Sequence, residues 1–199
     1  MKIGIINYNA GNIKSVANAL KKIGIECDVL SNPGSLNIYD KLILPGVGAA
    51  KSAMTQLQEN GFVEPLKSFK KPILGICLGL QLFSDFSEEG GVDCLSVIPG
   101  VVRRFDFVDR ELKVPQIGWN KVFLKKNDSL FDGIQSGEFF YFVNSYYLQT
   151  SEDFVIAKTS YGIDFASVVR KENFFATQFH PEKSGEVGLK LLNNFCLKC

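Results

Sequence analysis

A cysteine lies between small residues in the segment Gly75–Gln81, which follows an apolar run and reads GICLGLQ. A strand-to-helix turn of this kind is a nucleophile elbow, because its glycines allow a sharp turn and keep bulky neighbours away from the central side chain. The start of the following helix favours a thiolate at Cys77 and offers backbone N–H groups to an oxyanion. The pattern alone also fits a small buried hydrophobic residue, since free cysteines are often buried. Cys77 is therefore a candidate thiol nucleophile.

The only histidine of the chain, His180, follows an apolar segment that predicts a strand over Phe174–Phe179. Parallel α/β sheets gather their active groups at the carboxyl ends of their strands. Pro181 favours an extended backbone at His180, so Glu182 projects from the same side and can orient the imidazole. A lone histidine is usually incidental, but these two details predict a triad of Cys77, His180 and Glu182.

Other thiol and metal chemistries fit this sequence less well. An α/β-hydrolase carries its acid before the histidine, whereas Glu182 follows His180, and the papain-type sequence around the nucleophile is absent. Cys196 and Cys199 have C-x-x-C spacing, but no second pair accompanies them. We therefore expect an inert helix end there, with no metal site and no cofactor.

A glycine-containing loop, PGVG at Pro45–Gly48, separates a predicted strand from a predicted helix. Its backbone is expected at the same sheet edge as Cys77, where Gly46 and Val47 would form an oxyanion loop. On spacing alone, an ordinary tight turn between strand and helix is preferred over an oxyanion loop. The chain contains neither a Walker A pattern nor G-x-G-x-x-G, so a nucleotide site has no support.

Strands and helices alternate in the first half of the chain, which predicts βαβ units and a mainly parallel sheet covered on both faces. The predicted strands are Lys2–Tyr8, Cys27–Leu30, Lys41–Leu44 and Pro72–Ile76. The predicted helices run from a cap at Asn12 to Gly24, over 49–60, to about Phe69, and onward from Cys77.

The second half contains many short strand-like runs, and a helix with Val187, Leu191 and Phe195 on one face closes the chain. The predicted strands are Val101–Phe105, Leu112–Ile117, Phe139–Val143, Phe154–Thr159, Phe165–Val169 and Phe174–Phe179. Trp119, the only tryptophan, follows one of these runs without helical periodicity, which predicts a loop. The fold class is therefore α/β, an open, mainly parallel twisted sheet with helices on both faces and additional short strands, in one domain over 1–199.

The composition of the chain limits the kinds of partner it can bind and the cellular compartment in which we expect it. The chain has 199 residues and a formal net charge of +1, without the basic excess that nucleic-acid binding needs. No apolar run approaches the ~20 residues of a membrane span, and the N-terminus lacks the features of a signal peptide. Five cysteines are an odd number in a chain too long to need disulfides, so we expect reduced thiols in the cytoplasm.

Taken together, Gly75–Gln81 and the sequence FHPE at Phe179–Glu182 resemble the class I (triad) glutamine amidotransferases. Further motifs are similar to those of the glutaminase subunits of imidazole glycerol phosphate synthase. They are Tyr8–Asn12, Pro45–Gly48, Gly118–Asn120, Tyr141–Val143 and Gln178–Ser184. The resemblance covers essentially the whole chain, with the motifs in the same order.

This resemblance implies hydrolysis of glutamine to glutamate and ammonia. Cys77 would form a γ-glutamyl thioester, His180 would move the proton, and Glu182 would orient the imidazole. The glutamine pocket of the family corresponds to Gly48, Leu78, Gln81, Ser145 and Tyr146, and the oxyanion loop to Gly46 and Val47.

The resemblance also implies a heterodimer. Ammonia would pass to a cyclase subunit with a (β/α)₈ barrel, which makes imidazole glycerol phosphate and AICAR in histidine biosynthesis. Asn12 and Trp119 match the partner interface, and Trp119 would be partly exposed in the free subunit.

Two departures and two alternatives accompany the resemblance. Family members commonly carry histidine at the positions of Gln116 and Asn144, near the expected pocket or partner face. A paralogous glutaminase that feeds a synthase amidating a surface-polysaccharide sugar is one alternative. A catalytically silent partner-binding module is another, although the intact Cys77, His180 and Glu182 argue against it.

Overall fold

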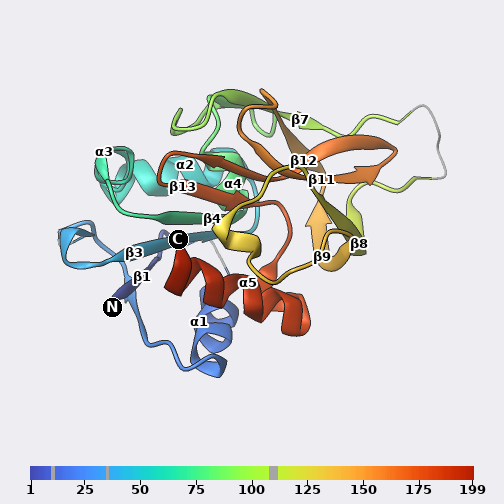
Figure 1. Cartoon of the computed structure of the whole chain (residues 1–199). Coiled ribbons are helices and arrows are strands. Elements are labelled where there is room, and N and C mark those ends of the chain that lie inside the picture. The colour runs from blue at the N-terminus through green and yellow to red at the C-terminus, as the bar shows by residue number, and fades with distance from the viewer. Residues whose placement is uncertain (10–11, 35, 108–111) are drawn as a thin grey trace.

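A computed structural model describes residues 1–9, 12–34, 36–107 and 112–199 of the chain. Within these residues thirteen strands form the sheet, whose main path runs β2-β1-β3-β4-β13-β12-β10-β7-β5-β6. Strands β8, β9 and β11 extend from β12 to one side of this path. The sheet is open, and its helices lie on two faces (Figure 1). The predicted fold class is confirmed.

The sheet has a parallel half that comes mostly from the first part of the chain. Its neighbouring strands β2, β1, β3, β4 and β13 all run parallel. Their bounds are β1 Ile3–Ile6, β2 Cys27–Leu30, β3 Lys41–Gly46, β4 Ile73–Cys77 and β13 Phe174–Thr177. The carboxyl ends of β3, β4 and β13 are therefore adjacent, as parallel pairing requires.

The remaining strands pair mostly antiparallel, with β5 and β7 the exception. Their bounds are β5 Phe86–Ser87, β6 Val92–Asp93, β7 Gly100–Arg104, β8 Gln116–Leu124, β9 Glu138–Asn144, β10 Tyr146–Thr150, β11 Val155–Tyr161 and β12 Ile163–Lys171. Long antiparallel strands need no crossover helix, which explains why this half contains few helices.

Helices cover both faces of the parallel half. Their bounds are α1 Ile13–Lys22, α2 Ala50–Glu59, α3 Val63–Ser68, α4 Leu78–Leu82 and α5 Gly185–Lys198. Three short 3₁₀ helices are η1 Leu36–Ile38, η2 Ser129–Phe131 and η3 Pro181–Lys183. Figure 1 shows α1 and α5 on one side of the sheet and α2, α3 and α4 on the other.

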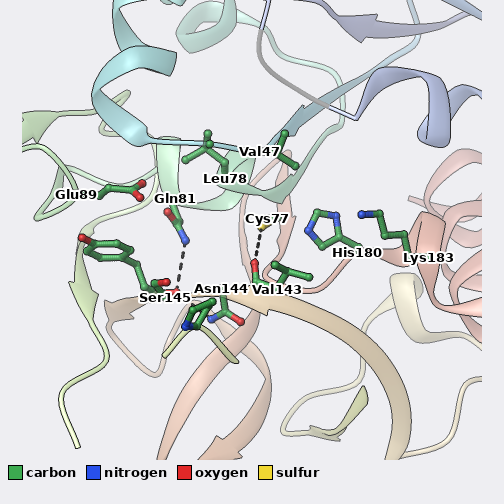
Figure 2. A pocket seen from close by; sticks show the side chains of 13 residues that line it. Val47, Cys77, Leu78, Gln81, Glu89, Val143, Asn144, Ser145, His180 and Lys183 are labelled. Carbon is green, nitrogen blue, oxygen red and sulfur yellow. Dashed lines mark hydrogen bonds between the residues drawn. The ribbon is translucent and has the colours of Figure 1, made fainter. Parts of the chain in front are cut away.

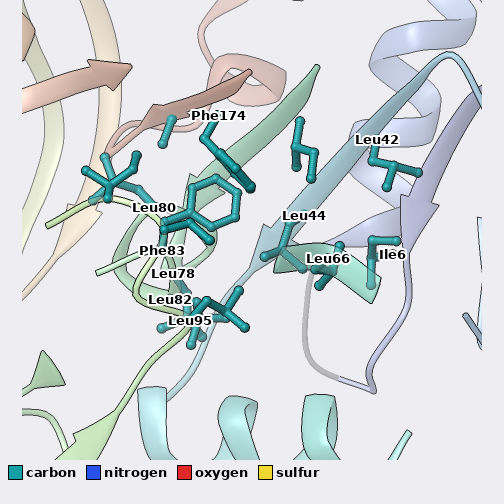
Figure 3. Packing of buried hydrophobic residues seen from close by; sticks show 14 of the residues in the cluster. Ile6, Leu42, Leu44, Leu66, Leu78, Leu80, Leu82, Phe83, Leu95 and Phe174 are labelled. Atoms are coloured by element: carbon teal, nitrogen blue, oxygen red, sulfur yellow. The ribbon is translucent and has the colours of Figure 1, made fainter. Parts of the chain in front are cut away.

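Two hydrophobic cores result from the alternation of side chains along the parallel strands. Along β3, Leu42 and Leu44 pack toward α2, α3 and α4, whereas Ile43 packs toward α1 and α5. Figure 3 shows the first core, in which Leu66 of α3 and Phe83 lie against strand residues. Phe83 meets Phe174 of β13 edge-on, with ring centroids 5.4 Å apart. Both cores hold β4 in place, and β4 carries the candidate nucleophile.

The region around Trp119 differs from its prediction. The predicted strand Leu112–Ile117 is wrong for its first part, because β8 begins only at Gln116, after a cis peptide bond between Val114 and Pro115. The predicted loop at Trp119 is also wrong, since Trp119 lies within β8 and pairs with Tyr141 of β9. The loop prediction fails because Gly118 and Asn120, residue types that are depleted in strands, lie here in a strand on either side of Trp119.

None of the helices in the part of the chain that the structure describes is long and apolar enough to span a membrane.

Candidate functional site

Cys77 occupies the turn between β4 and α4 with a backbone φ of 55°, a left-handed conformation that is uncommon for a non-glycine residue. The turn is tight because α4 packs directly against backbone. A Cβ added at Gly79 would lie 1.9 Å from the carbonyl oxygen of Leu44, and one at Gly75 would lie 2.8 Å from Gly79 backbone atoms. The glycines predicted to permit an elbow are therefore required by close packing on both sides of Cys77.

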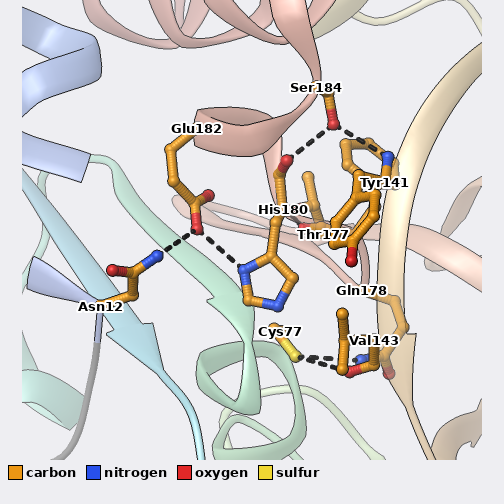
Figure 4. A network of polar contacts seen from close by, with 10 residues as sticks. Asn12, Cys77, Tyr141, Val143, Thr177, Gln178, His180, Glu182 and Ser184 are labelled. Atoms are coloured by element: carbon orange, nitrogen blue, oxygen red, sulfur yellow. Dashed lines mark hydrogen bonds and ion pairs between the residues drawn. The ribbon is translucent and has the colours of Figure 1, made fainter. Parts of the chain in front are cut away.

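His180 follows β13, the strand next to β4, so its side chain reaches the same sheet edge as Cys77. Its Nδ1 lies 2.8 Å from Oε1 of Glu182, and both side chains are buried (Figure 4). The predicted extended backbone does not continue from His180 to Glu182. His180 is extended, but Pro181–Lys183 forms a 3₁₀ turn, and this turn rather than a continued strand brings Glu182 back to the imidazole.

Burial and hydrogen bonding act in opposite directions on His180. Burial of the imidazole lowers its pKa, whereas hydrogen bonds and charge interactions with Cys77 and Glu182 raise it. The second group of effects is stronger, and the pKa of His180 is raised to about 10. At neutral pH the ring is therefore held as an imidazolium beside the sulfur.

Asn12 lies at the N-cap position of α1, as predicted, but its side chain makes no capping hydrogen bond. Instead, Nδ2 of Asn12 donates to Oε1 of Glu182 over 3.4 Å. The cap prediction is thus wrong for the side chain, which supports the carboxylate that orients His180. Ala10 and Gly11 of the same motif lie outside the described residues.

The backbone of His180 is fixed to strand β9. The amide of His180 donates to the carbonyl oxygen of Tyr141 over 2.9 Å. The hydroxyl of Ser184 donates to the carbonyl oxygen of His180 and accepts a hydrogen bond from the Tyr141 amide, at 2.6 and 3.0 Å. Figure 4 shows this network on the side of His180 away from Asn12. The imidazole is consequently positioned through both its ring and its main chain.

The PGVG segment reaches the site through the register of the sheet, in which Gly46 pairs with Cys77. A Cβ on Gly46 would lie 2.4 Å from the hydroxyl oxygen of Tyr8, so this glycine is closely packed. The buried Tyr8 hydroxyl also donates to the carbonyl oxygen of Pro45 over 3.0 Å. Beyond this anchor, Gly48 has a φ of 98° and no atom within 4 Å of an added Cβ. The loop is fixed at its start and unconstrained at its end.

A pocket with a volume of about 250 Å³ opens beside Cys77 (Figure 2). It brings together most of the expected site residues, namely Val47, Gly48, Cys77, Leu78, Gln81, Ser145, Tyr146 and His180. Gly46 and Glu182 do not line it, because Gly46 packs against Tyr8 and Leu78 and Glu182 lies behind His180. Asn12 and Trp119, expected at a partner interface, also lie outside the pocket.

Sequence reasoning missed several residues that line the pocket: Glu89, Pro115, Val143 and Lys183. Glu89 and Lys183 bring opposite charges to the two ends of the pocket, on either side of Cys77 (Figure 2). A carboxylate of Glu89 accepts a hydrogen bond from the amide of Ala50 over 2.9 Å. Lys183 carried a local signal, because it directly follows Glu182, the partner of His180, whereas Glu89 reaches the site through the fold.

The two positions that depart from the family pattern face each other. Gln116 pairs with Asn144 across β8 and β9, and both are buried. Asn144 lines the pocket, and its Nδ2 donates to the carbonyl oxygen of Tyr146 over 3.0 Å. Over the described residues, no group of three or more histidine, cysteine or acidic side chains is arranged to hold a metal ion.

Comparison with known proteins is consistent with this geometry. The family model described as glutamine amidotransferase class-I matches residues 4–199. The imidazole glycerol phosphate synthase subunit HisH of Bacteroides fragilis is 50% identical over 195 residues, which are 98% of each chain. The HisH subunit of Archaeoglobus fulgidus is 50% identical over 194 residues, 97% of this chain and 96% of that one.

Solved structures agree on the fold. The structure of PurLQS from Thermotoga maritima is similar with a TM-score of 0.74 and 19% identity, over 98% of this chain and 97% of that chain. Because the family match spans nearly every residue and relatives share half of them, this chain belongs to the class I glutamine amidotransferase family.

Proposed function

We propose that this chain hydrolyses glutamine to glutamate and ammonia as the glutaminase subunit of imidazole glycerol phosphate synthase. The observation that carries the proposal is the convergence of Cys77, His180 and Glu182, with His180 and Cys77 both lining one pocket. The names of the half-identical relatives support the assignment to histidine biosynthesis over the two alternatives. The activity belongs to one domain, residues 1–199, which a continuous sheet supports.

The first half of the reaction forms a thioester. The Cys77 thiolate attacks the side-chain carbonyl carbon of glutamine, and the carbonyl oxygen becomes an oxyanion beside the backbone of Gly48 and Leu78. The imidazolium of His180 transfers its proton to the amide nitrogen. The C–N bond then breaks, ammonia leaves, and the γ-glutamyl group remains on the sulfur.

The second half returns the enzyme to its starting state. Neutral His180 takes a proton from water, which attacks the thioester carbonyl. The C–S bond breaks, glutamate leaves, and Cys77 is again a thiolate beside an imidazolium. The Glu182 carboxylate stabilises the charged ring, with its Oε1 2.8 Å from Nδ1 of His180.

The pocket orients the substrate by its two ends. With the side-chain amide at Cys77, the amino-acid end of glutamine extends toward Gln81 and Glu89 (Figure 2). The Glu89 carboxylate is suited to the substrate ammonium, and the backbone and side chains of Ser145 and Tyr146 line the same wall. The ammonia is released at the opposite end, near His180.

An exposed apolar surface beside the pocket supports the proposal that this chain binds a partner protein. The outer face of β8 and β9 carries four large exposed hydrophobic side chains, which are Ile117, Trp119, Phe123 and Phe139. Trp119 is 55% exposed and meets the ring of Tyr141 edge-on, with centroids 5.9 Å apart. Exposed apolar patches of this kind mark protein–protein contacts, and tryptophan is a frequent anchor there.

The exposed apolar surface continues along β9 to the edge of the pocket, because alternate residues of a strand share one side. Phe139, Tyr141 and Val143 share the outer side of the strand, and Val143 lines the pocket. A subunit docked on this face would cover the end at which ammonia leaves and keep it from bulk water. We assign this face, together with Asn12, to a cyclase subunit with a (β/α)₈ barrel. The resulting heterodimer binds neither nucleic acid nor membrane, and works in the cytoplasm, where thiols such as Cys77 stay reduced.

The proposed function is tested by reconstitution with the barrel cyclase subunit of the same organism. With glutamine as the nitrogen source, we expect imidazole glycerol phosphate, and we expect none when Cys77→Ala replaces the wild-type chain. Ammonium salt should restore synthesis in the Cys77→Ala complex, because the cyclase is unchanged. Glutamine hydrolysis without such product, coupled instead to a sugar synthase, would favour the paralogous alternative. No hydrolysis in any complex would favour the silent module.

A further inference from the structure

A buried glutamine that the mechanism above does not use lies next to the nucleophile. Gln178 is the first residue after β13, and Cys77 ends the neighbouring parallel strand β4. Because Thr177 pairs with Ile76, the next residue on each strand brings Gln178 beside Cys77. The side chain of Gln178 is completely buried, and its amide must therefore find partners within the protein.

Both ends of this amide have partners. Nε2 of Gln81 donates to Oε1 of Gln178 over 3.4 Å, which leaves the Gln178 nitrogen on the other side. Nε2 of Gln178 then donates to Sγ of Cys77 over 3.8 Å (Figure 4). The backbone amide of Gln178 donates to the carbonyl oxygen of Ser167 over 2.9 Å, so the residue is held at its main chain as well.

We propose that Gln178 is a further catalytic residue, whose side-chain amide donates a hydrogen bond to the Cys77 sulfur and stabilises the thiolate. Gln81, which lines the glutamine pocket, orients this amide through its own hydrogen bond. The proposal rests on the proposed function, in which Cys77 is the nucleophile. It adds a neutral donor to the charge interaction between Cys77 and His180.

Besides its contact with His180, the sulfur has two hydrogen bonds that favour opposite protonation states. The carbonyl oxygen of Val143 lies 3.7 Å from Sγ and can only accept, so it favours the thiol. The N–H group of Gln178 can only donate, so it favours the thiolate. A carboxylate at position 178 would repel the thiolate. An apolar side chain would remove one of the two acceptors of the Gln81 amide and leave the carbonyl oxygen of Tyr146 as the other.

Other charged or titratable groups face Cys77 and stay constant when Gln178 is changed. His180 lies against the sulfur from beyond the end of β13, and Tyr8, two residues after β1, is close enough for its pKa to be raised by burial and by the Cys77 charge. Glu89 and Lys183 line the same pocket, and Glu182 acts through His180. A change in the titration of Cys77 on substitution of Gln178 alone can thus be assigned to Gln178.

The test measures alkylation of Cys77 by iodoacetamide as a function of pH, followed by mass spectrometry of the peptide that contains Cys77. We expect the pH of half-maximal rate to rise by about one unit in Gln178→Met, the size of one hydrogen bond to a charged group. Gln178→Glu keeps the shape of the side chain and should also raise this pH. Gln116→Met removes a different buried amide and should leave the pH of half-maximal alkylation unchanged.

An unchanged pH of half-maximal rate in both Gln178 variants would overturn the proposal, and so would an equal rise in Gln116→Met. If Gln178→Met does not fold, Gln178→Leu takes its place, because a carboxylate would raise this pH by repulsion alone. Failure of the proposed function is separate, because it would show as wild-type Cys77 that does not react with an electrophilic glutamine analogue.

Discussion

At His180, burial and neighbouring charge act in opposite directions, and the neighbours have the larger effect. Burial lowers the pKa, and Cys77 and Glu182 raise it to about 10. Because this value lies above the ordinary 6.5, the imidazolium stabilises the fold fully below pH 6.5. That contribution is lost as the pH rises through about 10.

Replacing Glu182 by Gln is therefore expected to lower the pKa of His180, since one of the two groups that favour the charged ring becomes neutral. The only imidazole of the chain gives a single set of NMR signals, whose titration reports this pKa directly. Glu186→Gln, at an exposed carboxylate in α5, is the control. An unchanged titration in Glu182→Gln would show that the 2.8 Å contact does not set the charge of the ring.

Residue types and local spacing were sufficient to predict the triad. Cys77 has a glycine two residues before it and another two residues after it, and Glu182 lies two residues from the only histidine. Glu89 and Gln178 were not predicted as site residues. Glu89 reaches the pocket only through the fold, and the contact of Gln178 with the sulfur follows from the pairing of β13 with β4. Chemistry that depends on neighbours in sequence is readable, whereas chemistry that depends on neighbouring strands requires the fold.

At the scale of elements, the elbow depends on how closely α4 approaches β3. A Cβ at Gly79 would lie 1.9 Å from the backbone oxygen of Leu44, where nothing flexible can move away. We expect Gly79→Ala to lower the free energy of unfolding by about 3 kcal/mol or more, measured by urea denaturation. Gly34→Ala, whose added Cβ meets only the Asn32 side chain at 3.4 Å, should change it little. Equal stability of the two variants would contradict this packing.

The oxyanion loop gives a second prediction at this scale. Gly46 is packed against Tyr8, but Val47 is exposed and Gly48 is unconstrained, so peptides after Gly46 can rotate toward or away from the oxyanion. We expect the isolated chain to be a poor glutaminase and its partner to raise kcat. The measurement is glutamate release with and without saturating partner. Equal turnover in both conditions would rule out gating by this loop.

The outer face of β8 and β9 gives a third prediction at the scale of elements. Trp119→Ala should weaken association with the cyclase subunit by at least ~2 kcal/mol, because an exposed aromatic anchor is lost. The free energy of unfolding of the isolated chain should change little, since Trp119 is 55% exposed. Titration calorimetry measures the affinity, and Leu197→Ala, an exposed side chain in α5, is the control. Unchanged affinity with a destabilised chain would assign Trp119 to the core.

The elements themselves were predictable where burial follows the usual pattern. Apolar runs predicted all of β1 and β2 and most of β3 and β4, and helical spacing predicted α1, α2 and α5. Strand β8 differs from its prediction because Gly118 and Asn120 lie on either side of Trp119. Glycine and asparagine are depleted in strands and typical of loops, so residue type pointed to a loop here.

At the scale of the whole molecule, the order of the strands assembles the site. Residues 77 and 180 are about a hundred positions apart in sequence, yet β4 and β13 are adjacent and parallel, so both residues follow strands that end at one edge. The antiparallel half adds the wall formed by Val143, Asn144 and Ser145, and the outer face beside it. Sequence reasoning predicted the α/β class but not this neighbour relationship.

The central claim is that Cys77 is the nucleophile of a glutaminase, and covalent labelling by an electrophilic glutamine analogue tests it most directly. After reaction of the partner complex, peptide mass spectrometry should locate the adduct on Cys77, with excess glutamine slowing its formation. Cys27, Cys94, Cys196 and Cys199 serve as internal controls, because burial raises the pKa of each of these thiols. An adduct on one of them, or labelling of Cys77 that glutamine does not slow, would contradict the account.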